Sequence, residues 1–242
     1  MTAPTRGDGL ARLSPSICDP ESEGRSLVDE GLAKVSLLVY EPFATLSTKL
    51  DRSGWELVTK PYNQGGTQAV LVEDRLTRVV ALVFRGTEAT RFNLADIWSN
   101  VGWPRAWQGK GKAHSGYADA FADIAWHAHD LIQYVAPDQP LYVTGHSMGG
   151  ALATLYASWA KHRLDGLVTF GAPKAVDARA AANIRTPIRR YVLPMDFAPS
   201  WPPVILTHPA PETRLPSTHW WPGPLSRHGV GQYLDAFRAD RV

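Results

Sequence analysis

The chain has 242 residues, of which 44% are hydrophobic, and its formal net charge is +2. This length allows one sizeable domain, and the composition is that of a globular protein rather than a disordered one. Because the net charge is small and the basic residues are scattered, nothing indicates a nucleic-acid partner. Cys18 is the single cysteine, which excludes an intramolecular disulfide.

The N-terminal residues MTAPTRGDGLARL contain charged residues, glycine and proline, and they lack the apolar segment of a secretory signal. No run approaches the ~20 apolar residues that a membrane-spanning helix needs. We therefore expect a soluble, cytoplasmic protein with no transmembrane segment, and export by another route as the alternative. Residues 1–23 are expected to form an irregular arm of a single domain that covers residues 1–242.

Hydrophobic periodicity predicts the elements that follow this arm. Apolar residues at helical spacing predict helices over 26–40, 115–135, 148–162, 175–183 and 231–241. Apolar or alternating runs predict strands over 55–60, 67–73, 78–84, 141–144, 166–170 and 188–193. Strands that alternate with helices favour an α/β fold with a mainly parallel central sheet and helices on both faces.

The segment LYVTGHSMGGALA, residues 141–153, contains a GxSxG pattern between a predicted strand and a predicted helix. This context is typical of a nucleophile elbow, in which Ser147 stands on a sharp turn above the sheet edge. Gly145 and Gly149 suit such a turn because side chains there would collide with neighbouring backbone. The alternative is a glycine-rich turn with an idle serine.

A nucleophilic serine needs a base and an acid that orients the base. Thr87, Ser147 and Asp196 each follow an apolar strand, so they can gather at the carboxyl edge of a parallel sheet, where ligands bind in such folds. The simpler alternatives are a strand-terminating turn at Thr87 and a turn aspartate at Asp196.

Eight histidines could supply the base. Three are set aside by position: one adjoins the serine and is expected to point elsewhere, one closes a helix, and one precedes the serine against the chain order Ser, Asp, His. These are His146, His162 and His114. The residues after Asp196 leave His208, His219 and His228 open, and His228 ranks first because it lies in a glycine-containing loop before the last predicted helix.

In their order along the chain, these segments resemble the class 3 lipase family, the fungal-type triacylglycerol lipases and their bacterial relatives. VVALVFRGT resembles the family's strand and oxyanion turn, and VTGHSMGGALATLYA resembles its elbow. RRYVLPMDFAPSWPP is similar to the segment that bears the acid, and RHGVGQYLDAF to the segment that bears the base. ILTHPAPE resembles a family stretch with a structural histidine, which argues against His208.

The resemblance implies an α/β-hydrolase fold and a serine carboxylic-ester hydrolase that works through an acyl-serine intermediate. It implies Ser147 as nucleophile, His228 as base and Asp196 as the acid, with Tyr233 five residues after the base. The backbone amides of Thr87 and Met148 would form the oxyanion hole. No metal or organic cofactor is expected.

Acylglycerols or similar lipid esters, met at a lipid–water interface, are the substrates that the resemblance implies. A phospholipase, a short-chain esterase and an aryl-ester hydrolase remain alternatives. From another class, a non-catalytic hydrolase-like binding module is the rival, although it would not be expected to keep all three catalytic residues.

The tryptophan-rich segment after Thr87 follows FNLADIW, which resembles the family's lid. Trp98, Trp103 and Trp107 are therefore expected to form an apolar lid over the acyl site. The alternative is ordinary packing in the core, because large aromatic residues are mostly buried.

Overall fold

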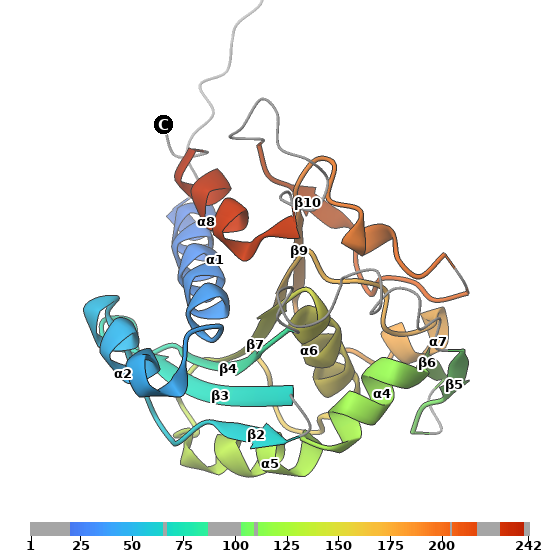
Figure 1. Ribbon diagram of the computed structural model, residues 1–242, viewed down its shortest axis with the longest axis horizontal. Helices are drawn as coiled ribbons and strands as arrows, with labels where there is room; N and C mark the ends of the chain where they lie inside the picture. Colours follow the sequence, from blue (N-terminus) through green and yellow to red (C-terminus); the bar gives the residue numbers. More distant parts are fainter. Residues whose placement is uncertain are drawn as a thin grey trace, which may run out of the picture.

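The structure is a computed structural model that describes residues 20–64, 67–86, 103–108, 111–203, 205–216 and 228–239. Its centre is an eight-stranded sheet in the order β1-β3-β4-β7-β8-β9-β10, with β2 paired to β3 (Figure 1). The strands are β1 (Trp55–Leu57), β2 (Tyr62–Gln64), β3 (Thr67–Asp74), β4 (Val80–Phe84), β7 (Leu141–His146), β8 (Gly166–Phe170), β9 (Ile188–Val192) and β10 (Glu212–Arg214). A separate hairpin pairs β5 (Pro104–Ala106) with β6 (Lys112–His114).

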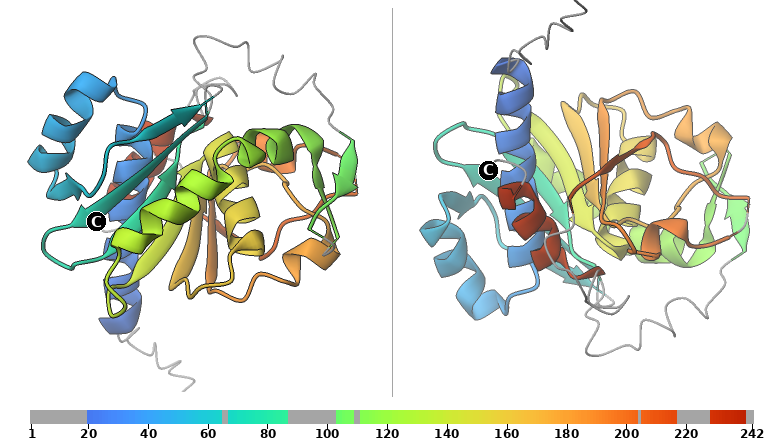
Figure 2. Two further views of the ribbon diagram at one scale, coloured as in Figure 1. Left: turned by 90° about the horizontal axis from the view of Figure 1, so that it is seen from below. Right: turned by 90° about the horizontal axis from the view of Figure 1, so that it is seen from above.

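Strands β4, β7, β8, β9 and β10 run parallel to one another, whereas β1, β2 and β3 form antiparallel pairs at one side of the sheet. Helices α1 (Pro20–Leu38), α2 (Phe43–Arg52) and α8 (Val230–Ala239) cover one face. Helices α4 (Ser115–Ala122), α5 (Ala125–Leu131) and α6 (Met148–Trp159) cover the other (Figure 2). The predicted mainly parallel sheet with helices on both faces is confirmed.

The alternating direction of side chains along the central strands explains why helices cover both faces of the sheet. In β4, Leu82 and Phe84 enter the core beneath α4, α5 and α6, while Ala81 and Val83 enter the core beneath α1, α2 and α8. Successive side chains of a strand point to opposite faces, so a strand that is apolar at every position needs cover on both. All five residues of β4 and of β8 are buried.

Several boundaries differ from the predictions. The expected irregular arm is wrong for residues 20–23, because α1 begins at Pro20. The single helix expected over 115–135 is divided into α4, α5 and a 3₁₀ turn, Ile132–Tyr134. Buried Phe121, Ile124 and Ala128 continue the apolar spacing across the break, so periodicity alone does not reveal it. The remaining short elements are α7 (Ala178–Ala181) and the 3₁₀ turn Ala198–Ser200. Among the described helices, none is both long and apolar enough to cross a bilayer.

The register brings the carboxyl ends of four strands to one edge. Phe84 pairs with Gly145, His146 with Phe170, and Phe170 with Tyr191. The turns after β4, β7, β8 and β9 therefore meet, as the positions of Ser147 and Asp196 after apolar strands predicted.

Candidate active site

Ser147 stands on a strained turn between β7 and α6. Its φ of 57° and ψ of −129° lie in a region that residues with a side chain rarely adopt. The turn is held by the Ser147 amide, which donates to the carbonyl of Phe170 at 3.0 Å. A Cβ on Gly149 would overlap the Phe84 carbonyl oxygen, and one on Gly145 would overlap the Gly149 carbonyl group. The predicted requirement for both glycines is confirmed.

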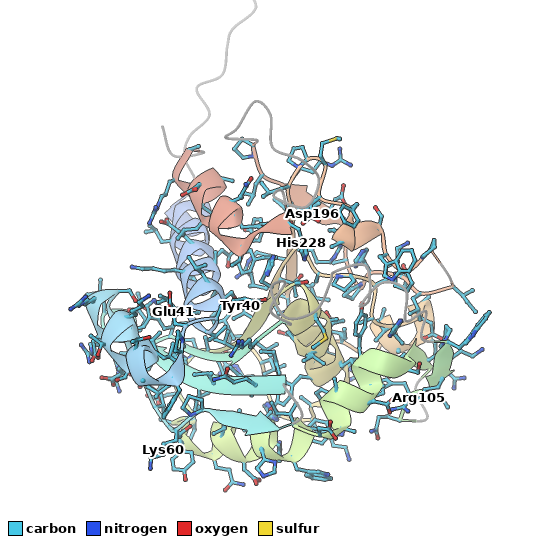
Figure 3. All side chains as sticks on the ribbon, in the orientation of Figure 1. Tyr40, Glu41, Lys60, Arg105, Asp196 and His228 are labelled. Carbon is cyan, nitrogen blue, oxygen red and sulfur yellow. The ribbon has the colours of Figure 1, made fainter. Side chains whose placement is uncertain are left out.

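A continuous hydrogen-bond chain joins Ser147, His228 and Asp196. The Ser147 hydroxyl Oγ lies 2.7 Å from His228 Nε2. His228 Nδ1 lies 3.0 Å from Asp196 Oδ1 and 3.1 Å from Oδ2, so it donates to the carboxylate. The His228 and Asp196 side chains are buried, while Ser147 is half-buried. Figure 3 shows Asp196 and His228 side by side above the sheet.

Two further donors fix the Asp196 carboxylate. The Ala198 amide donates to Oδ1 at 3.0 Å, and the Tyr233 hydroxyl donates to Oδ2 at 2.6 Å. Tyr233 is fully buried on α8, and its pKa is raised well above 10 by burial and by the negative charge of Asp196. The phenol therefore stays a donor, and these two donors orient the carboxylate toward His228.

Gly171, directly after β8, also belongs to the site and was not predicted. It has a φ of +58°, and a Cβ there would lie 2.7 Å from Asp196 Oδ2 and 2.8 Å from the Tyr233 hydroxyl. Glycine alone allows both this backbone conformation and the close approach of the acid and the base. A glycine that ends the strand next to the elbow strand was the available signal.

His146 was expected to point away from the serine, and its ring indeed bonds elsewhere. Its Nε2 lies 2.6 Å from the backbone carbonyl of His228, and its Nδ1 lies 3.2 Å from the Tyr40 hydroxyl. Neither contact was predicted, since the partners are 82 and 106 residues away in the chain.

The other histidines differ in their contacts. His114 forms the N-cap of α4, where Nδ1 accepts from the Tyr117 amide at 3.4 Å. His208 lies 2.7 Å, at Nε2, from the Pro199 carbonyl, and burial lowers its pKa to about 4. His162 follows α6 rather than closing it, because the helix ends at Trp159. His219 lies outside the described residues.

The predicted oxyanion donors are described in part. Met148 is the first residue of α6, where backbone N–H groups are directed out of the helix and toward the serine turn. Thr87 lies outside the described residues, which end at Gly86 on this side of the gap.

The three candidate lid tryptophans separate. Trp98 lies outside the described residues, and Trp103 is 77% exposed at the start of the β5–β6 hairpin. Trp107 is 5% exposed, packs against Phe121 at 5.5 Å between ring centroids, and donates from Nε1 to the Ser158 hydroxyl at 3.2 Å. The lid expectation is therefore wrong for Trp107, which belongs to the core beneath α4 and α6.

Metal ligation has no support in the part of the chain that the structure describes. There, no group of three or more histidine, cysteine, aspartate or glutamate side chains is placed to hold a metal ion. The buried polar groups at the sheet edge bond one another instead, as Ser147, His228, Asp196 and Tyr233 do.

A family model for class 3 lipases matches residues 81–206, which is more than half of the chain. The chain belongs to the class 3 lipase family. The match includes Ser147 and Asp196, while the remaining members of the site, His228 and Tyr233, follow it.

Individual lipases resemble the chain over part of their length. The lipase of Rhizomucor miehei is 29% identical over 154 residues, which are 57% of this chain and 41% of that protein. The lipase of Rhizopus niveus is 27% identical over 166 residues, 62% of this chain and 42% of that protein. The chain thus spans about two fifths of the length of these relatives.

Solved structures show the same fold at lower identity. The Rhizomucor miehei lipase propeptide complex superposes with a TM-score of 0.63 at 23% identity, over 81% of this chain and 69% of that one. The nonglycosylated Yarrowia lipolytica lipase superposes with a TM-score of 0.62 at 20% identity, over 82% of this chain and 81% of that one. The predicted α/β-hydrolase fold is confirmed.

Proposed function

We propose that this class 3 lipase hydrolyses carboxylic esters, acylglycerols or similar lipid esters, through an acyl-serine intermediate. The supporting observation is the unbroken bonding from Ser147 through His228 to Asp196 on a strained elbow. The lipases of Rhizomucor and Rhizopus among its relatives favour lipid esters over other acyl compounds.

The geometry allows each proton transfer that ester hydrolysis needs. As Ser147 Oγ attacks the ester carbonyl carbon, its proton passes over 2.7 Å to His228 Nε2. His228 then protonates the leaving alkoxide, which departs as the alcohol. Water attacks the acyl-serine, gives a proton to His228, and the carboxylic acid leaves as the serine regains its proton. Asp196 holds the Nδ1–H tautomer and stabilises the imidazolium.

The negative oxygen of the tetrahedral intermediate needs donors that are already in place. The Met148 amide, at the N-terminal end of α6, is one proposed donor. The second is the Thr87 amide, for which the sequence resemblance is the support. The cover over the acyl site is proposed to include Trp98 and Trp103.

Ester hydrolysis is tested with p-nitrophenyl esters of increasing chain length and with an emulsified long-chain ester, together with labelling by a fluorophosphonate. We expect turnover and labelling of Ser147. In Ser147→Ala, both should fall by about 10⁴-fold or more with an unchanged melting temperature. A folded wild-type protein that neither turns over nor becomes labelled would indicate the binding module instead. The chain-length series separates lipase, short-chain esterase and aryl-ester hydrolase, and a phospholipid substrate tests the phospholipase alternative.

A further inference from the structure

On the basis of the hydrolase function proposed above, we propose that His146 is a positioning residue of the catalytic site. In this role it holds the backbone of His228, the proposed base, in place. Through Tyr40 it also joins His228 to the turn after β4. His146 touches no reacting atom; it acts through the base.

The hydrogen bonds assign a single tautomer to His146. A backbone carbonyl accepts and cannot donate, so Nε2, 2.6 Å from the His228 carbonyl oxygen, must carry the proton. Nδ1 then has a lone pair, which accepts the Tyr40 hydroxyl proton at 3.2 Å. The ring is 5% exposed, so neither partner is readily replaced by water.

Tyr40 extends the same chain of bonds to a third turn. It follows α1, and its hydroxyl accepts the backbone N–H of Gly86 while it donates to His146. A Cβ on Gly86 would overlap the Tyr40 hydroxyl, which shows how closely the two groups approach. The Arg85 guanidinium lies 5.7 Å from the centre of the Tyr40 ring. In Figure 3, Tyr40 lies at the α1 side of the site, below His228.

We call the chain of hydrogen bonds from the His228 carbonyl through His146 and Tyr40 to the Gly86 amide the relay. It connects the turns that carry three parts of the proposed machinery. Gly86 precedes the expected oxyanion residue, His146 adjoins the nucleophile, and His228 is the base. Because each donor has one acceptor, a shift of the turn after β4 or of the His228 backbone would break a buried hydrogen bond. The relay fixes these turns relative to Ser147.

A neutral His146 is also what the proposed chemistry requires of a neighbour. Its ring centroid lies 4.7 Å from that of His228, which becomes an imidazolium during turnover. Burial and the positive charge of His228 lower the pKa of His146 well below 6.5. Its ring also lies against Tyr233 on α8, at 5.9 Å between centroids, and the Tyr233 phenol is neutral.

Two amide substitutions separate a positioning role from simple packing. Glutamine can place an amide nitrogen near the position of Nε2, whereas the shorter asparagine places one near Nδ1. For His146→Asn we expect kcat to fall by about 10- to 100-fold with KM within about twofold, because small displacements of a catalytic group have effects of this size. His146→Gln should stay within about threefold of the wild type. The rate of fluorophosphonate labelling at Ser147 should follow kcat in both.

His162→Asn is the matched control. His162 lies just beyond the opposite end of α6, which at 12 residues is about 18 Å long. The same change there should alter kcat by less than about twofold. Thermal melts of all variants measure what each substitution costs the fold.

The proposal is overturned if His146→Asn equals the wild type or if His146→Gln is as impaired as His146→Asn. Tyr40→Phe removes one oxygen and tests the relay even where a His146 variant fails to fold. We expect it to lower kcat about 3- to 10-fold, and unchanged kcat overturns the relay through Tyr40. Failure of the hydrolase function itself is distinct, because the wild type would then show neither turnover nor labelled Ser147.

Discussion

A pair of histidine rings lies near each end of α6, and the two pairs differ in their hydrogen bonds. At the N-terminal end, both ring nitrogens of His146 and both of His228 have hydrogen-bond partners. Beyond the C-terminal end, the ring centroids of His129 and His162 lie 5.7 Å apart. Each ring has a buried Nδ1 that makes no hydrogen bond within the described residues.

This difference shows where the chain needs a defined tautomer. Proton transfer requires a known nitrogen to carry the proton, so the N-terminal pair is fixed by bonds from three turns. At the other end, Trp126 and Trp159 surround His129 at 6.5 and 5.5 Å between ring centroids, and His162 has one long contact, 3.5 Å from its Nε2 to the Tyr156 hydroxyl. We therefore expect substitutions at the first end to affect chemistry and those at the second to affect stability.

The largest effect should come from Asp196→Asn. The amide still fills the space of the carboxylate, but it no longer selects the Nδ1–H tautomer of His228 or stabilises the imidazolium. We expect kcat to fall about 10⁴-fold with a nearly unchanged melting temperature. Hydrolysis of p-nitrophenyl butyrate and a thermal melt measure the two quantities. A loss below about tenfold would show that the bonding of His228 is not what distinguishes this end.

Trp107→Ala should produce the opposite result. Trp107 packs on Phe121 and donates to Ser158 of α6, so its removal should lower the free energy of unfolding by about 3–5 kcal/mol. The kcat of the folded fraction should stay within about twofold. Trp103→Ala is the matched control, because this exposed ring should contribute less than about 0.5 kcal/mol. If Trp107→Ala leaves the melt unchanged and alters hydrolysis of an emulsified ester, Trp107 belongs to a lid after all.

Acid should have the smallest effect and should act on histidines that are at least partly buried, such as His208. His208 has a folded-state pKa of about 4 because burial, Arg190 and Lys174 disfavour its charge. The unfolded chain therefore binds this proton near pH 6.5, before the folded chain does, and stability that is present above pH 6.5 is lost as the pH falls toward 4. Burial also lowers the pKa of His162 at the far end.

Denaturant unfolding at pH 7.5 and pH 5 measures this loss. From His208 we expect about 1–2 kcal/mol, less than the full linkage value because the side chain is partly exposed. His208→Gln keeps a donor for the Pro199 carbonyl without the titration, so its unfolding free energy should vary less with pH. Equal pH dependence in the variant and the wild type would assign the acid sensitivity to other groups, such as those beyond α6.

The sequence was informative where one local feature determined the structure. The strands β4, β7, β8 and β9 were predicted because runs such as VVALVF suit burial on both faces, and Ser147 followed from the strand, turn and helix around it. His228 was different. Spacing ranked it above His208 and His219 without excluding them, and the resemblance to a family decided.

The structural features that were missed depend on distant parts of the chain. The contact of Tyr40 with His146 spans 106 residues, and neither residue type indicates the other. The short strands of the β5–β6 hairpin and β10 have three residues each, too few for an alternating pattern to stand out. Trp107 was misassigned because composition shows that tryptophans cluster but not which of them face the interior.

The wide spacing of the site along the chain has a consequence for its assembly during synthesis. Ser147 and Asp196 emerge from the ribosome well before His228, which lies 81 residues after the nucleophile. The partners of the Asp29 carboxylate on α1 are also made late, because Arg189 and Tyr191 follow it by 160 and 162 residues. A partly made chain therefore holds a serine without its base. Esterase activity should appear late, after α1 and α8 have come together, and it can serve as a sensitive report of complete folding.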